Sequence, residues 1–77
     1  MAHKSASVFG RIVRARRMEA GLSQEALADA AGLHRTFISM LERGTRNPSL
    51  DVIRKLARGL RTTAASLVEE VERMDRS

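Results

Sequence analysis

Apolar residues recur at helical spacing through most of the chain, in short runs separated by glycines and by serine or threonine residues. In the first run four apolar side chains fall on or beside one stripe: Phe9, Ile12, Val13 and Ala20. Ser7 can cap this run and Gly21 can end it, so the pattern predicts a helix over residues 8–20. Arg17 lies on the same stripe, where a half-buried guanidinium needs a carboxylate partner.

Four further runs predict shorter helices. Their expected ranges are about 24–31, 35–43, 50–60 and 64–74. Three residues stand where they can cap three of these helices: Ser23, Ser49 and Thr63. The apolar positions of the four runs are Leu27, Ala28, Ile38, Leu41, Leu50, Ile53, Leu56, Ala57, Leu60, Leu67, Val68, Val71 and Met74. The pattern contains no strand signal, and it predicts an all-α fold of five helices in a single domain over residues 1–77, with residues 1–6 flexible.

The second and third predicted helices are joined by a short turn containing Gly32, which is the arrangement of a helix-turn-helix over about residues 24–43. Gly32 can adopt a positive φ where the chain reverses, and Ala28 is small where the two helices must approach each other. If Ile38 and Leu41 face the core, the opposite face of the third helix is free. That face carries Arg35, Thr36, Ser39, Met40 and Arg43. Side chains near the N-terminal end of such a helix can contact base edges in the DNA major groove.

Charge supports a polyanionic partner. The 77 residues carry a net charge of +5, and the pI is about 11.3. Five basic residues and one acidic residue give each of the segments 1–20 and 45–61 a net charge of +4. Between them residues 21–44 are close to neutral, and residues 62–77 carry a net −2. Solvated arginine-rich helices are the plain alternative to nucleic-acid binding.

Composition argues against several other classes. The chain has no cysteine, and its two histidines, His3 and His34, lie far apart, so no metal site or cofactor is expected. No nucleophile with a nearby base is apparent, and an enzyme is not expected. No apolar run approaches the length of a membrane span, and the first residues do not form a signal peptide. The sequence therefore predicts a cytoplasmic protein.

The stretch GLSQEALA at residues 21–28 continues through Gly32 to LERG at 41–44 and NPSL at 47–50. These motifs resemble the phage repressor and Cro-like (XRE-type) family of bacterial regulators, and the resemblance covers about residues 8–70. It implies a lambda-repressor-like domain of five helices, in which the second and third helices contact double-stranded DNA.

The resemblance also implies roles for individual residues. Arg17 is expected to pair with Glu42, and Gln24 is expected to contact a phosphate and to brace the third helix. The resemblance places base contacts at Arg35, Thr36 and Met40, and Ser39 on the same free face is expected to join them. It places contacts to the DNA backbone at Gln24, Arg43, Arg46 and Asn47, and Ser23 and His34 are expected to add to these.

Two positions depart from the family pattern. Arg61 stands where many members have glycine, so the turn after the fourth helix is expected to differ or to carry strain. Met40 replaces a residue that is more often polar, and it can offer only an apolar contact, for example to a thymine methyl group. Arg14 and Arg16 are interpreted as solvated, with Arg14 able to steer DNA, and Phe37 as partly packed.

A module of this size must dimerise to contact enough bases for high specificity. We expect the dimer interface in the region of the fourth and fifth helices, formed by Leu67, Val71 and Met74. These side chains can also simply pack on the fourth helix, and the sequence leaves that alternative open.

The favoured function is a sequence-specific transcriptional regulator that binds a palindromic operator as a homodimer. Its size and style match restriction–modification controller proteins and small phage repressors. The alternative is an antitoxin-like or other protein-binding module that retains the fold. Neither a further domain nor a small-molecule effector is expected.

Overall fold

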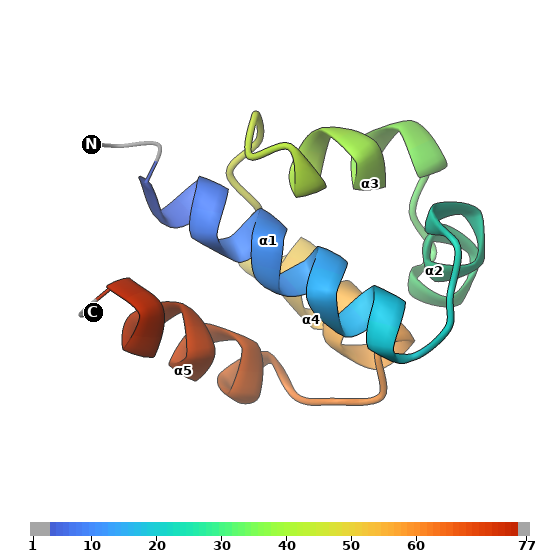
Figure 1. The fold of residues 1–77 in the computed structure, drawn as a ribbon. Helices are drawn as coiled ribbons and strands as arrows, with labels where there is room; N and C mark the ends of the chain where they lie inside the picture. The colour runs from blue at the N-terminus through green and yellow to red at the C-terminus, as the bar shows by residue number, and fades with distance from the viewer. Residues whose placement is uncertain (1–3, 76–77) are drawn as a thin grey trace.

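The computed structural model describes residues 4–75, and these form five α-helices without a strand. The helices are α1 Lys4–Glu19, α2 Gln24–Ala31, α3 Arg35–Glu42, α4 Leu50–Gly59 and α5 Ala64–Asp75 (Figure 1). The all-α, five-helix architecture predicted from the sequence is confirmed.

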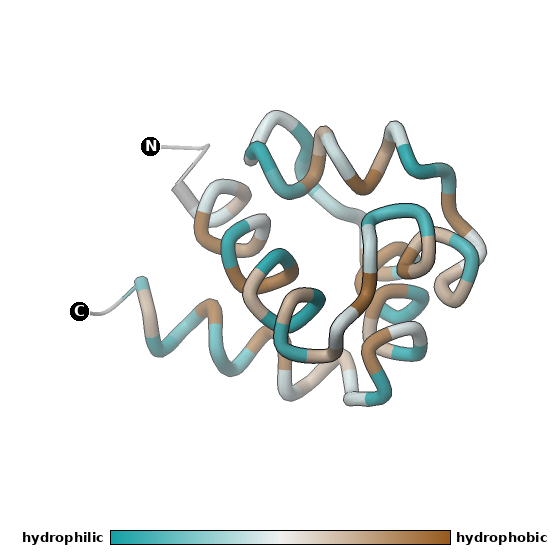
Figure 2. The backbone as a smooth tube through the Cα atoms, turned by 45° about the vertical axis from the view of Figure 1, so that its right-hand side comes forward, coloured by the Kyte–Doolittle hydropathy of each residue, from teal (hydrophilic) through white to brown (hydrophobic). Residues whose placement is uncertain are grey.

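Helix α1 lies across the middle of the molecule, with α3 on one side and α5 on the other (Figure 1). Helix α2 packs against α3 and α4, and α4 also packs against α5. All five helices contribute to one core, and Figure 2 shows hydrophobic segments on the sides of the helices that face one another. The largest wholly buried side chains are Val13, Leu27, Ile38, Leu41, Leu56 and Leu67.

The predicted caps of the later helices are present. The hydroxyl oxygens of Ser23, Ser49 and Thr63 accept hydrogen bonds from backbone N–H groups three residues ahead, at 3.0, 3.2 and 3.0 Å. Each bond satisfies an N–H group that the helix itself leaves without a partner. The capping residues therefore define where α2, α4 and α5 begin.

The first helix differs from its prediction. It begins at Lys4, so Ser7 lies inside the helix and does not cap it. The reason is that Ala6 and Val8 are buried and extend the apolar face by one turn toward the N-terminus. The prediction of a flexible segment is wrong for residues 4–6, and residues 1–3 lie outside the described residues. Ala20 is exposed, because the helix ends at Glu19 and the chain turns away at Gly21, where φ is +73°.

Two residues at the ends of α4 stand out. Leu50, an apolar position of the predicted helix, has 60% of its surface exposed, because it stands at the first position of the helix and projects away from the core. Arg61 follows the helix with a φ of +58°, a left-handed conformation that costs a residue with a Cβ roughly 1–2 kcal/mol. The strain expected in this turn is therefore present.

Gly10 allows α1 to approach α3 more closely than any other residue type would. A Cβ at this position would overlap the carbonyl oxygen of Leu41 and lie 3.0 Å from that of Glu42. Because both obstructing atoms belong to the backbone at the end of α3, they cannot move aside without shifting the helix.

We expect Gly10→Ala to destabilise the protein by roughly 1–3 kcal/mol, although helix propensity alone would favour alanine by about 1 kcal/mol. Gly59→Ala is the control for a less severe contact, since a Cβ there would lie 3.1 Å from Leu27 Cδ1 and 3.2 Å from the backbone nitrogen of Ala31, distances that shifts of a few tenths of an ångström relieve. Thermal and urea unfolding would measure both variants. A Gly10→Ala protein more stable than the parent would contradict the close approach of α1 and α3.

Candidate nucleic-acid interface

The turn between α2 and α3 is built around Gly32, which has φ +69° and ψ +37°. Its backbone N–H donates to the carbonyl oxygens of Ala28 and Asp29, and the N–H of Leu33 donates to Ala28 at 2.8 Å. These bonds satisfy carbonyl groups at the end of α2 while the chain reverses direction. The turn therefore holds α3 at a fixed angle to α2, with Ala28 buried where the two helices meet.

Helix α3 is anchored on one face and open on the other. Ile38 and Leu41 have no exposed surface, and Phe37 is half-buried against the core. Arg35 and Thr36 are exposed at the N-terminal end of the helix, and Ser39 and Met40 are half-buried one turn further on. The four residues that the sequence assigns to base contact are thus brought together along one helix.

The ends of α3 are less regular. His34 occupies the N-cap position, but its side chain makes no capping hydrogen bond. Arg43 follows the last turn and is exposed. Neither the His34 nor the Arg43 side chain makes a hydrogen bond or an ion pair with another described residue.

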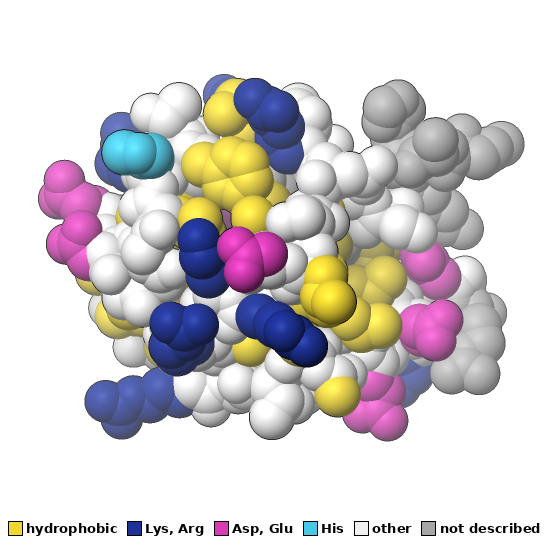
Figure 3. Space-filling view, turned by 180° about the vertical axis from the view of Figure 1, so that it is seen from behind, with side chains coloured by type: hydrophobic (Ala, Val, Ile, Leu, Met, Phe, Trp, Pro, Cys, Tyr) yellow, Lys and Arg dark blue, Asp and Glu magenta, His cyan; other side chains and the backbone are white. Residues whose placement is uncertain are grey.

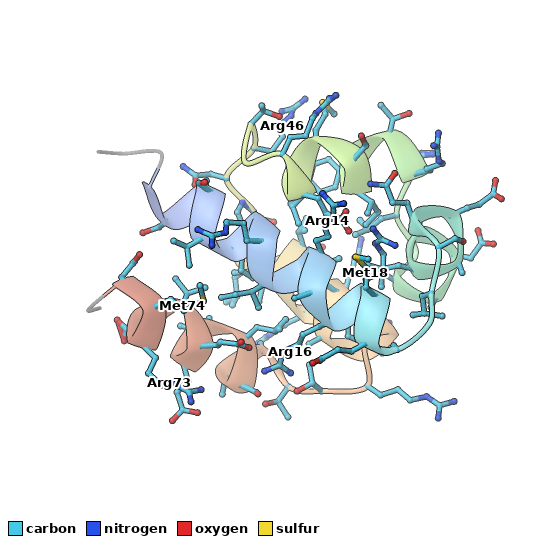
Figure 4. All side chains as sticks on the ribbon, in the orientation of Figure 1. Arg14, Arg16, Met18, Arg46, Arg73 and Met74 are labelled. Carbon is cyan, nitrogen blue, oxygen red and sulfur yellow. The ribbon has the colours of Figure 1, made fainter. Side chains whose placement is uncertain are left out.

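The loop after α3 is held against the helix by Thr45. Its backbone N–H and its hydroxyl both donate to the carbonyl oxygen of Met40, at 3.1 and 2.9 Å. Arg46 and Asn47 are exposed on this loop, and Figure 4 shows Arg46 beside the C-terminal end of α3. The loop therefore places a cation at the C-terminal edge of the α3 face.

Arg17 joins α1 to the base of α3. Its Nε lies 2.7 Å from Glu42 Oε2, and its terminal nitrogens donate to Glu42 Oε1 at 3.1 Å and to the Leu22 carbonyl at 2.8 Å. The Gln24 amide donates to the same Glu42 oxygen at 3.1 Å. The hydrogen bond to Glu42 raises the pKa of Arg17 above its ordinary value, so the guanidinium stays charged. The ion pair expected from the resemblance is formed, and Gln24 braces it from the start of α2.

Arg16 was interpreted as solvated, and the structure contradicts this. Its guanidinium donates to Glu70 Oε1 at 2.7 and 2.9 Å and to the hydroxyls of Thr62 and Ser66 at 3.3 Å each. The partners are 46 to 54 residues away in sequence, so no local pattern indicated them. Arg14 is exposed on the side of α1 that borders α3 (Figure 4).

The expected dimer interface needs correction. Leu67 is wholly buried in the core and cannot contact a second molecule. Val71 is half-buried, and Met74 lines a separate shallow groove between α1 and α5. Val68, which was not assigned to the interface, is 41% exposed.

An apolar groove of about 200 Å³ opens beside Val68, where the start of α1 meets α4 and α5. Hydrophobic side chains gather at the surface on this rear side of the molecule (Figure 3). The lining residues that matter here are Phe9, Pro48, Ile53, Val68 and Val71. Leu50, with 60% of its surface exposed, lies three residues before Ile53 on the same helix.

Within residues 4–75 the structure shows no cluster of three or more side chains suited to hold a metal ion. No described helix is long and apolar enough to cross a membrane.

A helix anchored by its inner face, preceded by a glycine turn and flanked by cations, defines a class of small helical proteins that insert one helix into the DNA major groove. The chain belongs to the helix-turn-helix family, whose model matches residues 13–67. The family membership that the sequence motifs suggested is confirmed.

Its relatives include several control proteins. Control protein C.BamHI of Bacillus amyloliquefaciens is 46% identical over 63 residues, which cover 80% of this chain and 78% of that protein. The crystal structure of the restriction-modification controller protein C.AhdI from Aeromonas hydrophila matches with a TM-score of 0.78 at 44% identity, covering 80% of this chain and 94% of that one. The controller protein C.Esp1396I matches with a TM-score of 0.84 at 27% identity, covering 95% and 96%. The chain is accordingly a helix-turn-helix DNA-binding regulator and not an enzyme.

Removing Arg17 should act through stability, because the Glu42 side chain is only 5% exposed and would be left without its charge partner. We expect Arg17→Met to lower the free energy of unfolding by roughly 2–4 kcal/mol. The double variant Arg17→Met with Glu42→Leu should lose less than Arg17→Met alone, since no charge is then stranded. Urea titrations of the three proteins measure this. If Arg17→Met and the parent unfold at the same urea concentration, the ion pair contributes nothing to the free energy of unfolding.

Proposed function

We propose that this protein is a transcriptional regulator of the restriction–modification controller type, which binds a palindromic operator as a homodimer. In this proposal α3 enters the major groove, and the loop after it follows the sugar–phosphate backbone. The observation that carries the proposal is the anchored α3, which presents Arg35 and Thr36 at its exposed N-terminal end and is followed at its C-terminal end by the loop containing Arg46.

The proposed base contacts are made by Arg35, Thr36, Ser39 and Met40. Arg35 is exposed in the first turn of α3, where a guanidinium can donate to O6 and N7 of one guanine together. Thr36 offers a hydroxyl and a methyl group next to it. Ser39 and Met40 are half-buried one turn further along the same helix, and they are proposed to contact the neighbouring bases. Met40 supplies an apolar contact suited to a thymine methyl.

The proposed contacts to the DNA backbone surround this helix. They come from Ser23 and Gln24 at the start of α2, from His34 before α3, and from Arg43, Arg46 and Asn47 after it. Gln24 already holds Glu42, so its contact to a phosphate would tie the DNA strand to the network that fixes α3. Such contacts set the register of the protein on the duplex and carry no sequence information directly.

Dimerisation is proposed through the apolar groove and its rim. A single helix-turn-helix module contacts few base pairs, and two copies related by a two-fold axis double that number. In a two-fold interface the same patch meets itself, which suits a surface that combines an apolar groove with an exposed apolar side chain. Leu50 of α4 and Val68 of α5 are exposed apolar residues on two of the three helices that meet at the groove.

Arg35 and Arg46 should differ in what they contribute to DNA binding. We expect Arg35→Ala to cost about 1–3 kcal/mol per half-site and to relax preference at one base pair in each half. Arg46→Ala should weaken all sequences about equally and lower the log–log salt slope by about one per protomer. Selection from random duplexes, followed by titrations at several salt concentrations, measures both. Identical base preferences for the parent and Arg35→Ala would overturn the base-contact assignment, and recovery of no palindrome would favour a protein-binding module.

A charge introduced into the groove should abolish self-association. We expect Val68→Glu to sediment as a monomer at micromolar concentrations where the parent is a dimer, because the interface would have to bury an unpaired carboxylate. Met18→Glu is the matched control, since Met18 is a 59% exposed apolar residue of α1 outside the groove. Dimers that persist in Val68→Glu would place the interface elsewhere.

A further inference from the structure

Arg16 lies between α1 and α5 and contacts three consecutive turns of chain (Figure 4). Its partners Thr62, Ser66 and Glu70 are spaced four residues apart, so they form one line that begins before α5 and continues along it. The planar guanidinium of Arg16 donates to all three side chains, and the carboxylate of Glu70 is the last of them along the chain. The side chains of Arg16 and Glu70 are 27% and 31% exposed, so water screens the pair only in part.

The apolar packing of α5 is thin. Leu67 is the one residue of this helix that is fully buried, and Val71 adds partial packing on the same face. Two neighbouring apolar side chains direct one face of the helix toward the core but define its rotation about the axis only coarsely. The line of hydrogen bonds from Arg16 adds directional restraints on that rotation, and Ser5 donates to Asp75 at 3.1 Å near the other end of α5.

The rotation of α5 decides what this helix shows to a second molecule. Val68 follows Leu67 by one residue, so it projects about 100° from it around the helix. With Leu67 turned into the core and Glu70 held by Arg16, Val68 lies in the wall of the apolar groove. A modest rotation of α5 in one direction would bury Val68, and in the other it would turn Val68 away from the groove.

We propose that Arg16 is a positioning residue for dimerisation: it fixes the rotation of α5 so that Val68 faces the partner protomer. This inference rests on the proposed dimer through the groove. Arg16 touches neither DNA nor the partner in this assignment, and it acts only through Glu70 and the two hydroxyls. Because the interface relates the two α3 helices, the same contact sets how well both helices reach their half-sites.

The test compares Arg16→Gln, Arg16→Lys and Glu70→Gln with the parent. Arg11→Gln is the matched control, since Arg11 is an exposed arginine of the same helix for which the described residues give no ion pair. Sedimentation equilibrium gives the dimer dissociation constant, and titration of a duplex with one half-site gives the affinity of the single module. Circular dichroism reports helical content.

We expect Arg16→Gln to raise the dimer dissociation constant about tenfold, the scale of one charge-assisted hydrogen bond. Arg16→Lys should lie between Arg16→Gln and the parent, because an ammonium keeps the charge but cannot span the line. Arg16→Gln combined with Glu70→Gln should lose no more than Arg16→Gln alone, since the pair acts as one unit. The affinity for the half-site duplex should stay within twofold of the parent's, and helical content should not change.

Three results would overturn the proposal. If the parent dimerises and Arg16→Gln has the same dimer dissociation constant, Arg16 does not position the interface. A parallel loss of half-site affinity and helical content would make Arg16 a general stabiliser of the fold. A parent that remains monomeric when bound to a full operator would overturn the dimer of the proposed function itself, and with it the role of Arg16.

Discussion

The arrangement of α2 and α3, the helices proposed to contact DNA, depends on the ion pair between Arg17 and Glu42. This pair is the point at which α1, α2 and α3 are joined by directional bonds, because Gln24 and the Leu22 carbonyl complete the network. Ile38 and Leu41 set how deeply α3 is seated, but apolar contacts alone have no preferred direction. A nearly buried carboxylate is stable only with its partners in place, so the network tolerates few orientations of α3.

Helix α1 serves two sides of the molecule through adjacent residues. Arg17 turns toward α3, and Arg16, about 100° around the helix, turns toward α5. One helix therefore holds both α3, which is proposed to contact DNA, and α5, which borders the apolar groove. The outward face of α3 and the apolar groove beside α5 therefore keep a fixed position relative to each other, because both helices pack on α1 (Figure 1).

Local features of the sequence predicted most of the fold. Glycines and hydroxyl side chains act on their own neighbours, so Gly32, Ser23 and Ser49 marked the helix ends correctly. The start of α1 was misplaced because Ser7 fits a cap by type, whereas the burial of Ala6 and Val8 depends on the remote segments that cover them. Arg17 and Glu42 were connected only through family resemblance, because no local rule joins residues 25 positions apart.

The surface of α5 shows most clearly what a helical repeat cannot decide. Leu67, Val68, Val71 and Met74 are all apolar, and the repeat alone fits several rotations of the helix. Their exposure separates them: Leu67 is in the core, and Val68 and Met74 border different grooves on either side of it. In our proposal the rotation of α5 that produces this pattern is fixed by the ion pair between Glu70 and the guanidinium of Arg16, 54 residues earlier in the chain. The assignment of interface residues on α5 thus follows from a polar contact across the fold, and an apolar pattern read along the helix could not supply it.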